Sequence, residues 1–168
     1  MKRSFSGSDP ATDNLRDALA REQERIDDLF VAAVDVLEAR DATRASHALG
    51  SLSRRLLAHL RTEERHLLPS LAEAHPKEAE MLRAEHAVIR SKLAALGMSV
   101  HSGALAPSHV LELAREVRSH GEREDALTYA WADAHLSAHE RIDLLARVRE
   151  RHAESQDAPV GPPRARDA

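Results

Sequence analysis

The stretch that decides the fold is residues 52–71, LSRRLLAHLRTEERHLLPSL. Its leucines at positions 52, 56, 67 and 71 fall on one face of a helix with 3.6 residues per turn. His59 and Glu63 occupy positions on this face where an apolar residue is due. Because residues i and i+4 overlie each other on a helix, the imidazole and the carboxylate point to the same side. The stretch therefore predicts a helix that carries a polar pair into an apolar core.

Apolar stripes of the same period continue along the chain and predict five helices. We expect them over 13–40, 43–74, 77–96, 107–134 and 137–152. Thr43 is interpreted as a cap, Gly97 as a stop, and Ser137 with Glu140 as a capping box. The four long helices are expected to form an up-down-up-down four-helix bundle. The short extra C-terminal helix would pack outside the bundle or form a dimer contact.

Composition also favours an all-α fold in a single domain. Aromatic residues make up only 2% of the 168 residues, which leaves little material for a sheet. Residues 1–11 and 155–168 are polar and contain Gly or Pro, so we expect them to be disordered. The bundle domain is expected to span residues 12–154.

The charge and hydropathy of the sequence limit the kinds of partner that the protein is expected to bind. The net charge of −4 is spread as mixed signs over the helix faces, which is not typical of a nucleic-acid-binding surface. The N-terminus lacks the apolar segment of a signal peptide, and no run approaches the roughly 18 apolar residues of a membrane span. We expect a cytoplasmic protein that binds neither nucleic acid nor membrane.

Polar residues interrupt the other long stripes as well. Gln23 interrupts the first, His86 the third, and His120 with Glu124, again i and i+4, the fourth. At a rise of about 1.5 Å per residue, Gln23, Glu63, His86 and Glu124 all lie at one level of an antiparallel bundle. Burying such groups without partners costs several kcal/mol, so the core needs either a metal or a closed hydrogen-bonded network. Because the chain has no cysteine, nitrogen and oxygen would hold any metal.

The polar positions also repeat. Residues 22–26, EQERI, correspond to residues 85–89, EHAVI, and the His-x-x-x-Glu at 59–63 corresponds to the one at 120–124. Two similar hairpins related by an approximate twofold axis would present two similar half-sites at the centre. That symmetry suits two metals bridged by carboxylates.

At these residues the chain resembles the hemerythrin-like, HHE-type cation-binding family, over about Leu15 to Ala134. The segments EHAVI (85–89), HLRTEERHLLP (59–69) and HGERED (120–125) are similar to motifs of that family. The resemblance implies a non-haem diiron centre. It further implies nitrogen ligands and bridging carboxylates from five residues: His59, His86 and His120, with Glu63 and Glu124.

The chain departs from the family pattern at Gln23, which stands where the family has its first histidine. An amide oxygen is a poorer iron ligand than an imidazole, so Gln23 is an altered ligand position and a hydrogen-bonding amide is the favoured interpretation. Three states stay open: a second metal on carboxylates, His59 and water; a single metal; or a metal-free core. Tyr129 and Trp131 are interpreted as core residues, and Asp27 as a residue at the edge of the bundle.

The leading functional hypothesis is a hemerythrin-like iron-binding protein that binds or senses O2 or a related small ligand, or iron. It would hold two irons per chain if the centre is intact, or one. The alternatives are a diiron enzyme acting on peroxide or nitric oxide, and a metal-free regulatory or scaffold bundle. No nucleophile triad, phosphate loop or nucleotide motif offers another catalytic interpretation. A monomer or weak homodimer is expected.

Overall fold

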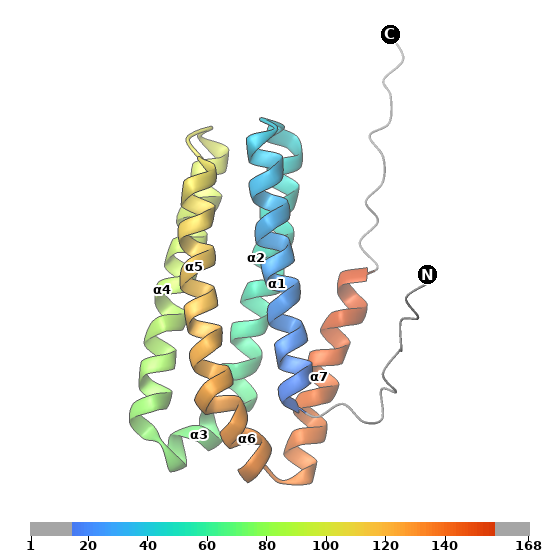
Figure 1. Cartoon of the computed structure of the whole chain (residues 1–168), viewed down its shortest axis with the longest axis vertical. Helices are drawn as coiled ribbons and strands as arrows, with labels where there is room; N and C mark the ends of the chain where they lie inside the picture. The colour runs from blue at the N-terminus through green and yellow to red at the C-terminus, as the bar shows by residue number, and fades with distance from the viewer. Residues whose placement is uncertain (1–14, 157–168) are drawn as a thin grey trace, which may run out of the picture.

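The computed structural model describes residues 15–156, all of them in helices or the short connections between helices (Figure 1). The four long helices are α1 (Leu15–Glu38), α2 (Ala42–His66), α4 (Pro76–His101) and α5 (Pro107–Arg123). The others are α3 (Leu68–Ala74), the π-helix η1 (Glu124–Tyr129), α6 (Ala130–His135) and α7 (Ala138–Gln156). No strand occurs within residues 15–156, and the all-α prediction is confirmed. The ends expected to be disordered lie outside the described residues, except that α7 continues through Gln156.

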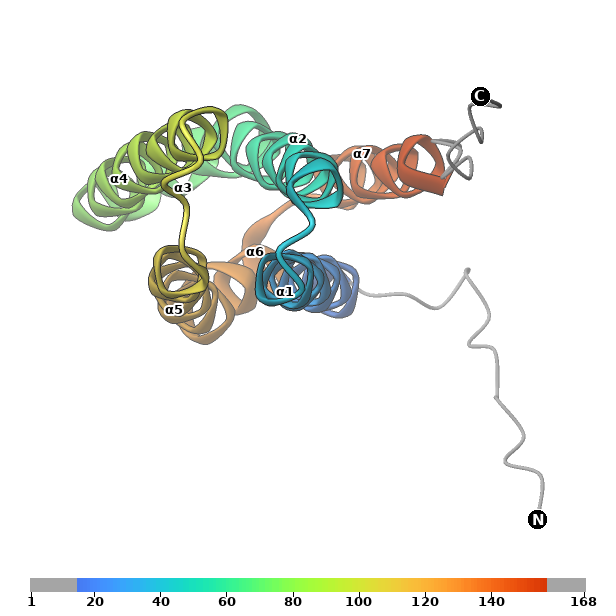
Figure 2. The ribbon, with the colours of Figure 1, turned by 90° about the horizontal axis from the view of Figure 1, so that it is seen from above.

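The four long helices run up, down, up and down, as predicted. Seen from above, α1 lies beside α2 and α5, and α4 lies beside the same two helices (Figure 2). Helix α7 packs against α1 and α2 on the outside of the bundle. Its first turn has the predicted capping box, because the Ser137 N–H donates to the Glu140 carboxylate and the Glu140 N–H donates to the Ser137 Oγ.

Six buried histidine and glutamate residues divide the core into parts. We call them the polar layer: Glu22, His59, Glu63, His86, His120 and Glu124. On the side of the α1–α2 and α4–α5 turns, the four long helices enclose the largest apolar cluster, which includes Ile26, Leu52, Ile89 and Val117. Two smaller clusters lie toward the other end of the bundle, one around Leu15 and Leu19, the other around Leu68 and Leu82. Full burial of each such side chain contributes about 1.5–3 kcal/mol, so these clusters provide most of the stabilisation.

The predicted helix 43–74 is wrong in two details. Its cap is Asp41, whose carboxylate accepts a hydrogen bond from the Arg44 N–H, rather than Thr43. It is also broken at Leu67, and α3 begins with Pro69 in its first turn. Since proline has no N–H to donate to the preceding turn, the break falls where a proline is tolerated.

The expected stop at Gly97 is also wrong. Helix α4 continues to His101, and open space surrounds the position that a Cβ on Gly97 would take. The chain leaves the helix at Gly103, whose φ of +70° is the left-handed conformation that favours glycine. A glycine within a helix weakens it by about 1 kcal/mol, which packing outweighs here.

The fourth helix was predicted to be regular and is not. Residues 124–129 form the π-helix η1, which inserts a wider turn and changes the face that the following residues present. The apolar stripe of a regular helix over residues 107–134 would have Leu127 on its inward face. Leu127 is instead 54% exposed, whereas Tyr129 is 2% exposed. In α7, the sequence pattern places Ile142, Leu145 and Val148 on one side of the helix. Val148 is buried in agreement with this pattern, as is Leu144, whereas Ile142 is exposed.

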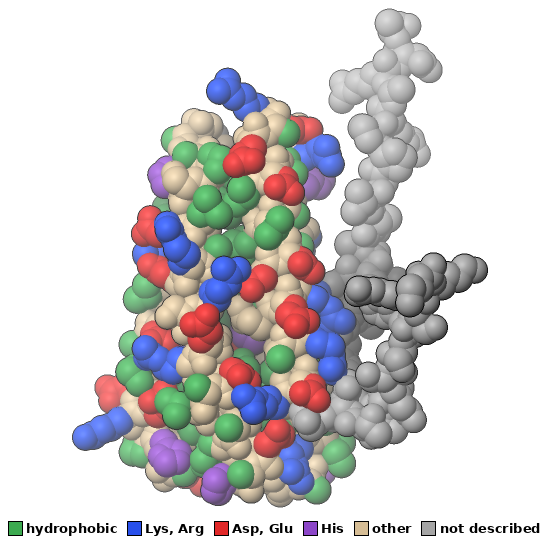
Figure 3. Space-filling view, viewed as in Figure 1, with side chains coloured by type: hydrophobic (Ala, Val, Ile, Leu, Met, Phe, Trp, Pro, Cys, Tyr) green, Lys and Arg blue, Asp and Glu red, His purple; other side chains and the backbone are tan. Residues whose placement is uncertain are grey.

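The surface agrees with the predicted charge pattern. On the face formed by α1 and α5, acidic and basic side chains alternate without a large patch of one sign (Figure 3). None of the helices within residues 15–156 combines the length and the apolar character needed to cross a membrane.

Candidate metal centre

Four buried side chains converge within the polar layer. Glu63 comes from α2, His86 from α4, His120 from α5 and Glu124 from the start of η1. Each offers one ligand atom, and these four atoms all lie within 4.8 Å of one another. We call these four residues the core cluster.

The Nε2 atom of His86 lies near the other three ligand atoms. It is 3.1 Å from His120 Nε2, 3.6 Å from Glu63 Oε2 and 3.8 Å from Glu124 Oε1. His120 Nε2 is in turn 3.3 Å from Glu124 Oε1. Neighbouring ligands on one ion with bonds of about 2.1 Å lie roughly 3 Å apart, so this spacing is close to that of a single coordination shell.

Two further carboxylates contact the Nδ1 atoms of the two imidazoles, on the side away from the core cluster. His86 Nδ1 lies 3.0 Å from Glu64, and His120 Nδ1 lies 2.8 Å from Glu85. When Nδ1–H donates to a carboxylate, the Nε2 lone pair of the neutral ring is available to a metal. Both rings are therefore oriented with Nε2 toward the core cluster.

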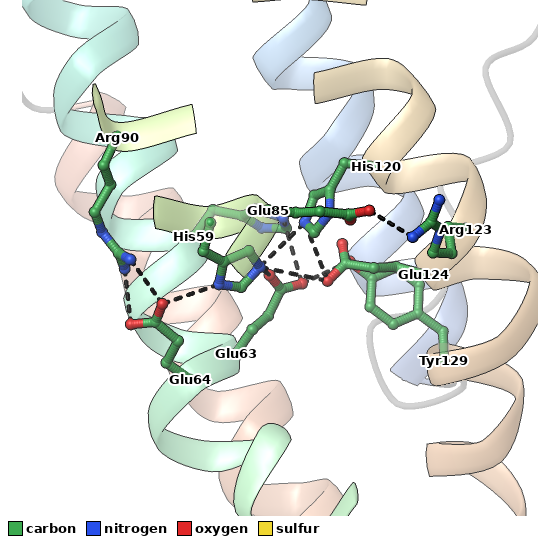
Figure 4. A network of polar contacts seen from close by, with 10 residues as sticks. His59, Glu63, Glu64, Glu85, Arg90, His120, Arg123, Glu124 and Tyr129 are labelled. Carbon is green, nitrogen blue, oxygen red and sulfur yellow. Dashed lines mark hydrogen bonds and ion pairs between the residues drawn. The ribbon is translucent and has the colours of Figure 1, made fainter. Parts of the chain in front are cut away.

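Each of these outer carboxylates is itself fixed by an arginine. Arg90 donates to both oxygens of Glu64 at 2.7 Å, and Arg123 donates to Glu85 (Figure 4). The two pairs lie on opposite sides of the site, with Glu63 and Glu124 between them (Figure 4). Because Arg90 lowers the pKa of Glu64, that carboxylate stays ionised and remains an acceptor.

The electrostatics of the cluster favour a positive charge at its centre. Burial lowers the pKa of His120, but the neighbouring carboxylates, led by Glu124, outweigh this effect and raise it to about 9. Burial likewise raises the pKa of Glu124, yet its hydrogen bonds with His120 and His86 hold that pKa well below the usual range. In the metal-free protein a proton on His120 supplies the positive charge.

A cation that binds His120 Nε2 must displace this proton, which makes binding depend on pH. Below about pH 9 His120 is protonated, so we expect Zn2+, a redox-inert probe, to release about one proton from it per ion at pH 8. The apparent affinity should rise up to about tenfold per pH unit from pH 7 to 9 and then level off. Calorimetric titration in buffers of different ionisation enthalpy measures the release. Affinity that stays constant over this range would contradict the assignment.

His59 is buried, at 1% exposure, but it lies outside the core cluster. Its Nε2 is 3.4 Å from Oε1 of Glu63, whereas Oε2 of the same carboxylate faces His86. The five sequence-predicted ligand residues are thus all buried, and four of them meet around one point.

Gln23 lies against α5 without joining the cluster. A Cβ on Gly121 would come within 2.9 Å of Gln23 Cδ, so the side chain occupies space that only a glycine leaves open. The amide oxygen and nitrogen are buried and form no hydrogen bond with any residue of 15–156. The hydrogen-bonding role of the Gln23 amide stays a prediction, because the nearest residue on α5 is Gly121, which has no side chain to bond. Asp27, one turn further along, forms an ion pair with Arg118 at 3.4 Å, in keeping with its interpretation as an edge residue.

Besides the contacts of Glu64 and Glu85, two further polar contacts were missed by the sequence analysis. Glu22 is fully buried and accepts a hydrogen bond from Arg55 at 2.6 Å. The Tyr129 O–H lies 2.6 Å from Glu63 Oε1 and 3.0 Å from Glu124 Oε2 (Figure 4). Burial, reinforced by these two carboxylates, raises the pKa of Tyr129 well above its usual value, so the phenol remains a donor. Tyr129 is a core residue as predicted, but its hydroxyl is part of the site.

The two halves of the repeat differ in more than residue 23. In sequence, Asp125 corresponds to Glu64, which holds His86. Asp125 instead forms a bidentate pair with Arg16, at 2.7 and 2.8 Å. The first hairpin therefore lacks both the imidazole and the carboxylate contact that would orient it.

Four antiparallel helices, with buried histidines and carboxylates meeting in one layer, define a cation-binding class of helical bundle. The family model described as the hemerythrin HHE cation binding domain matches residues 14–132, and the chain belongs to this family. This confirms the resemblance seen in the sequence. Comparison with curated proteins found no match, and comparison with solved structures found none either.

Proposed function

We propose that this protein binds one iron ion through Glu63, His86, His120 and Glu124, and that it binds or senses O2 or a related small ligand, or iron. The observation that carries the proposal is the convergence of four buried ligand atoms within 4.8 Å of one another. Two imidazoles and two carboxylates form a donor set that suits a first-row divalent metal such as iron.

The surroundings of the four residues fit a cation as well. Two carboxylates balance a double positive charge, and the buried Glu124 Oε1 lies 3.3 and 3.8 Å from the Nε2 atoms of His120 and His86. The apolar clusters on both sides of the polar layer exclude bulk water from the ligands. When bound, iron supplies open coordination positions and a change of oxidation state, which together permit binding of a small diatomic ligand or sensing of its presence.

The asymmetry of the two hairpins supports one ion rather than two. Gln23 replaces an imidazole, Asp125 is paired with Arg16, and His59 stands outside the core cluster. A second ion would have His59 as its only imidazole ligand, because residue 23 is a glutamine.

Metal analysis of the purified protein tests the proposal. Protein produced with added iron and then desalted is expected to retain close to one iron per chain. Retention of no iron would overturn the proposal, and two tightly held irons would overturn its one-ion part. Adding O2 to the reduced, iron-loaded protein should produce a change in the visible absorption spectrum. An unchanged spectrum would remove small-ligand binding from the proposed function and leave iron sensing.

A further inference from the structure

In each of the two core-cluster carboxylates, Glu63 and Glu124, the two oxygens contact different partners. Glu63 Oε2 and Glu124 Oε1 lie 3.6 and 3.8 Å from His86 Nε2. The remaining oxygens, Glu63 Oε1 and Glu124 Oε2, lie 2.6 and 3.0 Å from the Tyr129 hydroxyl. One imidazole and one phenol therefore each contact both carboxylates, on opposite sides.

The sequence repeat indicates which side chain the Tyr129 phenol replaces. The approximate twofold relation that the sequence repeat predicts exchanges Glu63 with Glu124 and His86 with residue 23. Under this relation, an imidazole at position 23 would face Glu63 Oε1 and Glu124 Oε2. With glutamine at this position, the Tyr129 hydroxyl occupies the contact that the symmetry reserves for that imidazole.

The π-helix is what brings Tyr129 to this point. Tyr129 follows Glu124 by five residues, and the wide turn of η1 brings residues five apart nearer the same face than an α-helix would. The ring packs in the apolar cluster of Leu15, Leu19 and Leu67, so the hydroxyl is held in place beneath the carboxylates.

We propose that Tyr129 stands in for the missing histidine as a positioning residue, which holds the outer oxygens of Glu63 and Glu124 and thereby reserves the centre for one ion. This inference rests on the proposed function. A second ion would need the two oxygens to which the phenol donates. It would find His59 as its only imidazole, and it would have to displace a donor whose ring is fixed by packing.

Anaerobic Fe2+ titration of four proteins tests this role: the wild type and the variants Gln23→His, Tyr129→Phe and Gln23→His/Tyr129→Phe. We expect one tightly bound ion in the wild type and in Gln23→His, because the phenol still holds the carboxylates. The double variant should bind two. A second ion in Gln23→His alone, or only one in a folded double variant, would overturn the inference. No iron in any of the four would overturn the proposed function itself.

Thr128→Val is the matched control, since it removes a buried hydroxyl of the same π-helix that has no hydrogen-bond partner among residues 15–156. Combined with Gln23→His, it should leave one ion per chain. If Gln23→His/Thr128→Val instead gains a second ion, general loosening of η1 rather than the Tyr129 contact controls the stoichiometry.

A spectroscopic measurement covers the case in which the double variant does not fold. Tyr129 is the only tyrosine in the chain, so any phenolate-to-Fe3+ charge-transfer band must come from it. The oxidised wild type should show no such band, because the phenol donates to carboxylates and does not bind the metal. A visible band that disappears in Tyr129→Phe would make Tyr129 a ligand and overturn the positioning role.

Discussion

Replacing His86 with alanine is expected to abolish iron binding at micromolar concentrations. His86 Nε2 is the atom that approaches the three other ligand atoms, at 3.1 to 3.8 Å. Substitution of residues that hydrogen-bond to metal ligands already lowers metal affinity by about 10–100-fold. Loss of a ligand itself should therefore lower the affinity by more than about 100-fold. Metal analysis and Fe2+ titration measure the loss.

His59→Ala is the matched control, because it removes a buried histidine of the same layer that lies outside the core cluster. It should retain one iron per chain with only a few-fold change in affinity. Full iron occupancy in His86→Ala, or complete loss in His59→Ala, would place the ion elsewhere in the layer. Circular dichroism of the metal-free variants confirms that the helices persist.

Replacing Arg55 with alanine is expected to lower the free energy of unfolding by about 3–5 kcal/mol, because it takes the guanidinium away from a buried carboxylate. Glu22 is fully buried, the Arg55 side chain is 10% exposed, and their atoms are 2.6 Å apart. Urea denaturation of the metal-free protein measures the change.

The double variant Glu22→Leu/Arg55→Leu separates this effect from packing. Since an apolar pair of similar volume often replaces a buried ion pair without loss, the double variant should recover most of the stability. A change below about 1 kcal/mol in Arg55→Ala would show that water or another group replaces the guanidinium.

The helices were predictable because local pattern decides them, and the errors occur where backbone geometry overrides that pattern. In a regular helix, an apolar stripe such as the one through Leu52 and Leu56 marks the buried face. Both residues are fully buried. Leu127 follows the same spacing, yet it is exposed because η1 widens the turn before it. The periodicity of side chains does not predict a π turn. The energetic cost of such a turn is offset by contacts between residues that are far apart in the sequence.

The candidate site was predictable to the extent that it interrupts a stripe. His86 and Glu124 stand where leucine is due, so burial of polar groups could be inferred from spacing alone. Glu64 and Glu85 were missed although each is adjacent in sequence to a core-cluster residue and contacts a ring from the helix opposite. Tyr129 was placed in the core, but its hydrogen bonds depend on the π-helix and could not be read from the stripe.

The position of α7 bears on the order in which the protein can assemble during synthesis. Leu144 and Val148 of α7 share one apolar cluster with Leu15 and Leu19 at the start of α1. The packing around the first turns of α1 is therefore completed only after α7 has been synthesised. The residues of the core cluster end at Glu124, so all of them emerge earlier. A nascent chain can thus bring its ligands together, and meet a metal, before its own N-terminal helix is fully sheltered.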